Sequence, residues 1–202
     1  TEIYTLSLHD ALPICSQVLD FYDQIQMVYH ELGIDEHCTN ESCSVMCAGE
    51  GFEYLWADGK TYKSPIKVRE AASLLCDRLS TLLTTSWMTI TPQVSAPEYI
   101  SLLFNWIDEQ IKDPSIFPSV EDEKPQYNAN FKNTISVIVK RLFRVYAHIY
   151  CSHWSDVINL QAEAHVNTCF KHFVLFSQEF KLIASKELVP LKNVIDQINL
   201  RG

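Results

Sequence analysis

The sequence has little of what the common catalytic and phosphate-binding motifs require. Only 5 of its 202 residues are glycine. It contains no glycine-rich phosphate loop, because Gly49-Glu50-Gly51 lacks a following Lys-Ser/Thr, and it has no Gly-x-Ser-x-Gly nucleophile turn. His30-Glu31 is followed by no second histidine at the spacing of a His-Glu-x-x-His protease. These absences argue against a P-loop nucleotidase, a serine hydrolase of that type and a zinc protease.

Positive charge and long apolar runs are scarce as well. The chain has 16 Lys and Arg against 25 Asp and Glu, a net charge of −9 and a pI near 5.2. A surface of that sign repels nucleic acid unless its few cations are concentrated in one place. No apolar run approaches the roughly 18 residues that cross a bilayer. With 47% hydrophobic residues, the sequence predicts a globular protein with a sizeable core.

The spacing of apolar residues predicts a mostly helical domain. Residues 19–29 carry a helical stripe that ends near Gly33, and Ser95 has the side chain of a helix N-cap. The helix after Ser95 should run toward Asp113-Pro114, which would end it. Further helical elements are predicted at about 131–154, 155–160, 163–180 and 187–200.

An aromatic alternation marks one departure from this helical pattern. Phe52, Tyr54 and Trp56 alternate with other residues and lead into Asp58-Gly59. This pattern predicts a small β-hairpin with residues 60–62 as its return strand. The fold class expected from the whole sequence is therefore an all-α helical bundle with a small β-hairpin, rather than an α/β enzyme.

Two stretches are predicted not to belong to the native protein. Residues 1–14 match the conceptual translation of a widely used sequencing adapter, so native sequence would begin near Cys15 as a single domain, 15–202, truncated at its N-terminus. Residues 68–93 combine a leucine-spaced helical half with a threonine-rich half. A surface helical insertion is one interpretation. Valine codons begin with GT and one glutamine codon is CAG, which match the two ends of a typical intron. The second interpretation is therefore a retained intron, and we favour it.

Two widely separated residue pairs have the chemistry of metal ligands. Cys38 and Cys43, and likewise His148 and His153, have four residues between them. Two thiolates and two imidazoles form a tetrahedral set that suits Zn²⁺. The alternative is that these residues only pack in the core. On an ideal helix the two histidines would not share a face, so the helix would have to end, bend or bulge between them.

A second candidate site is the cationic run that contains Lys140, Arg141 and Arg144. On a helix these side chains lie within about one turn of one another. They could form a solvated face paired with nearby carboxylates. They could also form a phosphate cradle, since guanidinium groups bind phosphate oxygens in a bidentate manner. Lys63 could join the same patch.

Four long motifs resemble the Mob/phocein family, and within it the branch that activates NDR/LATS-class kinases. The motifs are residues 38–46, 52–59, 140–150 and 163–173. The resemblance runs from about residue 19 to 198 and is interrupted at 68–93. It implies a Mob-type helical fold with a structural zinc ion, Zn²⁺, held by Cys38, Cys43, His148 and His153.

The resemblance also implies a function without catalysis. Family members are adaptors that bind and allosterically activate AGC-class kinases, in cell-cycle, mitotic-exit, cytokinesis and growth control. The pocket that matches Lys63, Lys140, Arg141 and Arg144 would bind phosphorylated segments of Ste20/Hippo-type kinases. Ser64 departs from the family, in which a second lysine is frequent, so phosphopeptide affinity would be reduced.

The kinase-facing surface implied by the resemblance uses the first helix. Asp20 matches a known type of kinase contact on that helix. The turns that precede it in relatives are replaced here by residues 1–14, so full kinase activation by this chain is in doubt. Cytoplasmic and nuclear localisation is expected, with no nucleic acid and no membrane insertion. The alternatives from other classes are a zinc-dependent hydrolase and a nucleic-acid-binding zinc protein.

Overall fold

The computed structural model describes residues 8–58, 94–114, 116–117 and 130–200. These residues are mostly helical, as predicted, and they contain no β-strand. The elements in chain order are α1 (Leu8–Gln26), the π-helical turn η1 (Met27–Glu31), α2 (Ile34–His37), α4 (Ala96–Ile111), α5 (Phe131–Ser152), α6 (Trp154–Asn159), α7 (Glu163–Glu179), the 3-10 turns η2 (Ser185–Glu187) and η3 (Val189–Leu191), and α8 (Lys192–Leu200).

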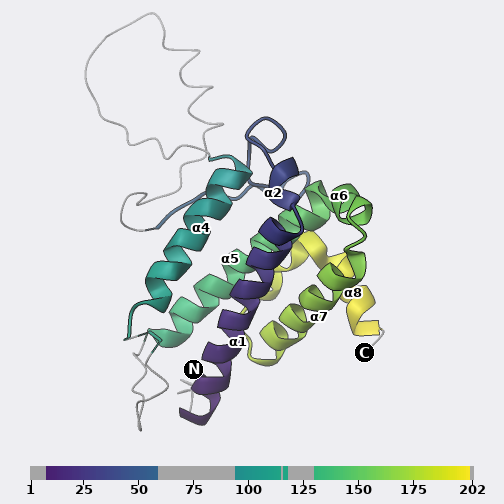
Figure 1. The fold of residues 1–202 in the computed structure, drawn as a ribbon. Coiled ribbons are helices and arrows are strands. Elements are labelled where there is room, and N and C mark those ends of the chain that lie inside the picture. The colour runs from purple at the N-terminus through teal and green to yellow at the C-terminus, as the bar shows by residue number, and fades with distance from the viewer. Residues whose placement is uncertain (1–7, 59–93, 115, 118–129, 201–202) are drawn as a thin grey trace, which may run out of the picture.

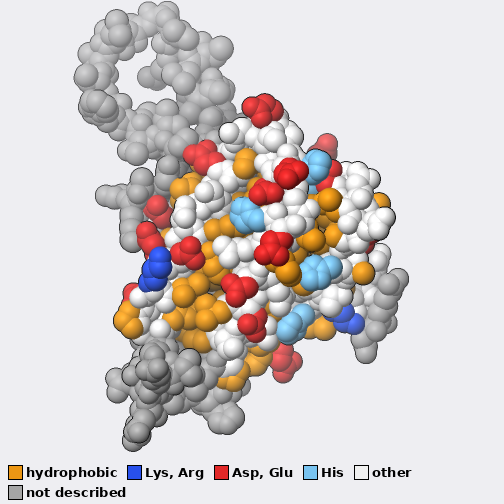
Figure 2. Space-filling model, in the orientation of Figure 1, with side chains coloured by type: hydrophobic (Ala, Val, Ile, Leu, Met, Phe, Trp, Pro, Cys, Tyr) orange, Lys and Arg blue, Asp and Glu red, His pale blue; other side chains and the backbone are white. Residues whose placement is uncertain are grey.

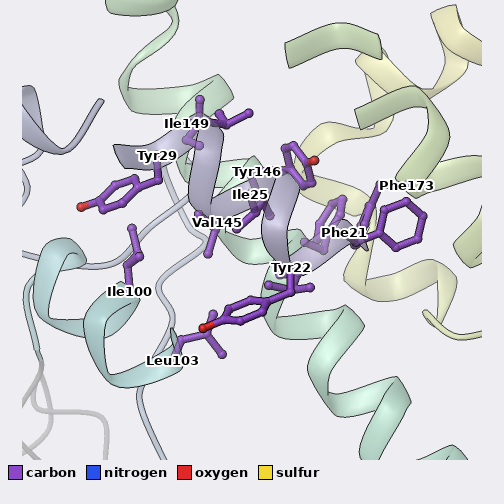
Figure 3. Packing of buried hydrophobic residues seen from close by; sticks show 14 of the residues in the cluster. Phe21, Tyr22, Ile25, Tyr29, Ile100, Leu103, Val145, Tyr146, Ile149 and Phe173 are labelled. Atoms are coloured by element: carbon purple, nitrogen blue, oxygen red, sulfur yellow. The ribbon is translucent and has the colours of Figure 1, made fainter. Parts of the chain in front are cut away.

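Helix α5 forms the centre of the bundle, with α1, α4 and α7 around it (Figure 1). Half of its 22 residues are buried. Aromatic side chains fill the junction of α1, α5 and α7 (Figure 3): the ring centroid of Phe173 lies 5.1 Å from Phe21 and 5.2 Å from Tyr146. Burying each such side chain contributes about 1.5–3 kcal/mol. This packing fixes α5, which carries both candidate sites.

The ends of the helices largely follow the predicted signals. The Ser95 side chain accepts a hydrogen bond from the Glu98 N–H at 3.4 Å, so it caps α4 as expected. Gly33 adopts a left-handed conformation (φ 76°) after η1, which a residue with a side chain would adopt at a cost. Helix α5 stops at Ser152, short of the predicted end near Trp154, because His153 leaves helical geometry at φ −124° and ψ 16°.

The predicted β-hairpin is not seen among the described residues. Instead, residues 52–54 lie antiparallel to residues 46–48, which precede them, through an isolated bridge between Cys47 and Glu53. The Ala48 N–H donates to the Phe52 carbonyl at 2.9 Å, and the Tyr54 N–H donates to the Met46 carbonyl at 2.8 Å. The expected return strand, 60–62, lies outside the described residues.

The two stretches predicted not to be native are only partly described. Residues 8–14 form the first turns of α1, where Ile14 is buried. Residues 1–7 and 68–93 lie outside the described ranges, so the origin of both stretches stays a prediction. Among the helices that are described, none is long and apolar enough to cross a membrane.

Candidate metal centre

The four predicted ligands come from two segments that are far apart in the chain. Cys38 follows the last residue of α2, and Cys43 ends a short turn in which its N–H donates to the Thr39 carbonyl at 2.8 Å. His148 lies in the last two turns of α5, and His153 is the residue between α5 and α6. The break at His153 removes the difficulty expected from the spacing, because the two histidines no longer have to share one helix face.

The ligand atoms of these four residues lie within 4.8 Å of one another, and all four residues are buried. Cys38 Sγ is 3.5 Å from His148 Nε2, and Cys43 Sγ is 3.3 Å from His153 Nε2. Sulfur and nitrogen ligands on one tetrahedral zinc ion would stand about 3.6 Å apart, given Zn–S and Zn–N bonds of about 2.3 and 2.0–2.1 Å. Both Cys–His distances are therefore close to those of a single tetrahedral site.

Each histidine directs Nε2 toward the sulfur atoms because its other ring nitrogen has a separate partner. His148 Nδ1 lies 2.8 Å from the Cys47 carbonyl, and His153 Nδ1 lies 3.0 Å from Asp156 Oδ2. Both partners are acceptors, so each Nδ1 donates and each Nε2 keeps a free lone pair. This arrangement is typical of histidines that bind metal. Sequence reasoning missed both partners. Asp156 could have been found, because it lies only three residues after His153.

The electrostatics of the buried site also fit a cation. Burial lowers the pKa of His148 to about 4, so its imidazole is neutral at physiological pH, the form that binds metal. Burial raises the pKa of the Cys38 thiol, the neighbouring Cys43 raises it further, and a hydrogen bond with Tyr29 opposes both effects. Thiolates at this site need a positive charge beside them. Zn²⁺ would supply that charge, and four protein ligands would complete its coordination.

The cationic run lies on α5, about one to two turns before His148. The Arg141 guanidinium is held between two indole rings, with its Cζ 4.6 Å from the Trp56 ring centroid and 4.4 Å from that of Trp106. It also donates to the Ala57 carbonyl through Nη2. Burial lowers the pKa of Arg141, although the group stays charged. Arg141 thus ties α5 to α4 and to residues 56–57.

Arg144 lies beside Arg141 and faces the same side of the bundle. Its Nη1 donates to the Tyr99 hydroxyl at 2.9 Å, and its Cζ lies 4.9 Å from the Tyr54 ring centroid. Among the described residues, Arg141 Nη1 and Arg144 Nε are buried and have no hydrogen-bond partner. Lys140 is half-buried on the same helix. The structure thus brings two of the predicted cations into one polar cluster with unused donors.

Two predicted site residues remain, Lys63 and Asp20. Lys63 lies outside the described residues. Asp20 is exposed on α1, where Asp23 is exposed as well. Acidic side chains and histidines are spread over the face of α1 and α4 in Figure 2, and few lysines or arginines lie among them. This face therefore carries negative charge, as the overall composition indicated.

Comparison with known proteins identifies the chain's relatives. The model of the Mob1/phocein family matches residues 14–86 and 83–191. "MOB kinase activator-like 1B" of Arabidopsis thaliana is 42% identical over 180 residues, which cover 89% of this chain and 70% of the relative. "MOB kinase activator-like 1 homolog C" of Dictyostelium discoideum is 43% identical over 183 residues, covering 91% and 71%. With its four-ligand centre and its helical bundle, the chain belongs to the Mob1/phocein family.

Proposed function

We propose that this chain is a non-catalytic adaptor that binds and activates NDR/LATS-class AGC kinases, in cell-cycle, mitotic-exit, cytokinesis and growth control. Its relatives bear the name MOB kinase activator-like, which supports a role in kinase regulation. The four-ligand centre supports a role without catalysis, because a metal held by Cys38, Cys43, His148 and His153 keeps no position for substrate or reactive water.

We propose Zn²⁺ as the metal of this centre, with a structural role. Two sulfur and two nitrogen ligands in tetrahedral spacing suit zinc better than calcium or magnesium, which prefer oxygen ligands. The ion would hold the turn between Cys38 and Cys43 against the end of α5. Cys47 and Asp156 would fix the orientation of the two imidazoles.

The cluster around Arg141 and Arg144 is the proposed binding site for phosphorylated segments of Ste20/Hippo-type kinases. The observation that carries this proposal is the pair of buried guanidinium nitrogens, Arg141 Nη1 and Arg144 Nε, that lack a partner among the described residues. A buried, unpaired donor is costly, and a phosphate group that entered as the covering side chains moved aside would satisfy these donors through charge-assisted hydrogen bonds. Lys140 and Lys63 are the further cations of the proposed site.

The acidic face of α1 is the proposed binding surface for the kinase itself. Asp20 is exposed there, and the chain has a net charge of −9. A basic helical segment that precedes the kinase catalytic domain would complement this surface. Such complementarity increases the association rate and selects partners more than it raises affinity. Cytoplasmic and nuclear localisation belongs to the same proposal and is checked by imaging the tagged chain.

The test compares two peptides that differ only by phosphorylation of a threonine. Fluorescence anisotropy should show binding of the phosphorylated peptide and at least a tenfold weaker affinity for its unphosphorylated form. Arg144→Ala should abolish this preference while circular dichroism stays unchanged. Lys132→Ala, which removes a cation three turns earlier on α5, should retain it. Equal affinity for the two peptides would refute the proposed pocket.

A second measurement separates this function from the two alternatives. A pull-down from the native cell with the tagged chain should capture an AGC-class kinase. Steeply salt-dependent binding to DNA or RNA would instead favour a nucleic-acid-binding zinc protein. Metal-dependent turnover of an ester or amide would favour a hydrolase.

A further inference from the structure

We propose that the Asp156 carboxylate is a positioning residue of the metal centre that braces both halves of the Cys–His site. This inference rests on the proposed metal, but it concerns a residue outside the four ligands. Asp156 lies in the first turn of α6, three residues after His153, and is only partly exposed. One carboxylate at this place contacts groups from both segments that supply the ligands.

The first contact holds a metal ligand directly. Asp156 Oδ2 lies 3.0 Å from His153 Nδ1, and the side chain of His153 is 3% exposed. His153 itself sits at the break between α5 and α6, outside regular helical geometry. Its backbone is anchored, because the His153 N–H donates to the Ile149 carbonyl at 2.9 Å and its carbonyl accepts from the Val157 N–H at 3.0 Å, but these bonds do not set the rotation of the imidazole ring. The Asp156 carboxylate supplies the missing constraint, since it fixes the ring orientation and keeps the proton on Nδ1.

The second contact reaches the cysteine segment. Asp156 Oδ1 lies 3.9 Å from Nδ1 of His37, the last residue of α2 and the one before Cys38. This contact is longer and the His37 side chain is 52% exposed, so its strength is small beside that of the first. Its position matters more than its strength, because Asp156 Oδ1 faces the cysteine segment and Oδ2 faces the histidine segment. Asp156 thus links the end of α2 to the start of α6.

The two histidines are held by different kinds of group. His148 donates to the carbonyl of Cys47, which belongs to the backbone and carries no net charge. His153 donates to a side-chain carboxylate, whose negative charge makes the opposite ring nitrogen a stronger metal ligand. Substituting Asp156 removes the hydrogen-bond acceptor of His153. No side-chain substitution at Cys47 removes the backbone carbonyl that accepts from His148. This difference makes the role of Asp156 open to a direct test.

The test measures zinc affinity of the full chain by competition with a chromophoric chelator. Asp156→Ala should weaken zinc binding by about 10- to 100-fold, the usual effect of losing such a partner. Asp156→Asn should have a smaller effect, because its amide oxygen accepts the same hydrogen bond without the charge. The control is Asp196→Ala, which removes an exposed carboxylate on α8 that pairs with Lys192. It should leave zinc affinity unchanged.

Nitrogen-15 NMR of the histidine rings supplies a readout that a general loss of stability would not produce. In the zinc-bound wild type, His153 should show a slowly exchanging Nδ1–H. That resonance should exchange faster in Asp156→Asn, while the Nδ1–H of His148 stays protected. If Asp156→Ala does not fold, Asp156→Asn still decides the matter.

The outcomes separate this inference from the assignment of the metal. A wild-type chain that binds no zinc overturns both. A wild-type chain that binds one zinc ion, with wild-type affinity and an unchanged His153 Nδ1–H in both Asp156 variants, overturns the role of Asp156 alone.

Discussion

The metal centre and the arginine cluster occupy neighbouring parts of α5, but they differ in how completely their polar atoms are paired. In the metal centre both histidine Nδ1 atoms have acceptors, and the four ligand atoms converge on one another. In the arginine cluster Arg141 Nη1 and Arg144 Nε have no partner among the described residues. In the first region, every one of these polar atoms would have a partner once a cation is bound. The second has buried donors that no described residue satisfies.

This difference is the basis for proposing separate roles for the two parts of α5. Buried polar groups in proteins are nearly always paired, so an unpaired one calls for an explanation. At the metal centre, pairing extends to groups that contact the ligands, which is typical of a structural site. In the arginine cluster, the aromatic rings hold the cations in place and still leave hydrogen-bonding capacity. We therefore expect changes in the first region to affect stability most, and changes in the second to affect partner binding as well.

The largest effect that follows from this comparison is expected from removing the metal. At free zinc about 1,000 times its dissociation constant, binding should add about 4 kcal/mol to the free energy of unfolding. Chelation should therefore lower the urea midpoint markedly, and Cys38→Ser should do the same without chelator. Cys151→Ser is the matched control, since Cys151 is exposed and is not among the four ligands. Identical unfolding curves with and without chelator would contradict a structural metal.

A smaller loss of stability is expected when Arg141 is truncated. Arg141→Ala removes two cation–π contacts and a hydrogen bond to the Ala57 carbonyl. We expect a loss of about 2–3 kcal/mol, measured by urea unfolding. Lys140→Ala, which changes the adjacent half-buried cation, should change stability by no more than about 0.5 kcal/mol. If the two variants are equally stable, Arg141 does not tie α5 to α4.

The smallest effect concerns the hydroxyl that orients Arg144. Tyr99 is buried, and its hydroxyl accepts from Arg144 Nη1 at 2.9 Å. Tyr99→Phe should cost about 1 kcal/mol, and it should weaken phosphopeptide binding because the guanidinium loses its orientation. Tyr150→Phe is the control: that hydroxyl donates to Asn167 on the surface, away from the cluster. Unchanged phosphopeptide affinity in Tyr99→Phe would show that Tyr99 does not orient Arg144.

Much of the helical fold could be predicted from the sequence, because the signals are local. Apolar spacing and Ser95 anticipated α4 closely, and the stripe in residues 163–180 anticipated α7 to within one residue. The π-helical turn at 27–31 was not predicted. A π-turn differs from an α-turn by one residue of hydrogen-bond spacing, which a short apolar pattern does not resolve. Among the described residues, 52–54 pair with the segment before them, and the predicted return strand, 60–62, lies outside the described ranges.

For the candidate site, the sequence indicated the residues but not the groups that contact them. Residue chemistry and the family resemblance together indicated the four residues whose ligand atoms the structure brings together, although neither could show that α5 ends at Ser152. The partners of the histidines were missed, because one is a backbone carbonyl 101 residues away and a carbonyl has no sequence signal. The setting of Arg141 was missed for a similar reason. Trp56 and Trp106 are distant in sequence, and only the packing of α4 on α5 brings them to the same guanidinium.

The break that places His153 also has a consequence for the order of events during synthesis. Each Cys–His contact of the metal centre joins residues 110 positions apart. On the ribosome, the two cysteines emerge long before either histidine, so they must wait as free thiols while more than half of the chain is made. A metal bound by all four residues would close the site only after the break between α5 and α6 has left the exit tunnel. We therefore expect the metal to bind late, after most of the helical bundle has formed, rather than to initiate folding.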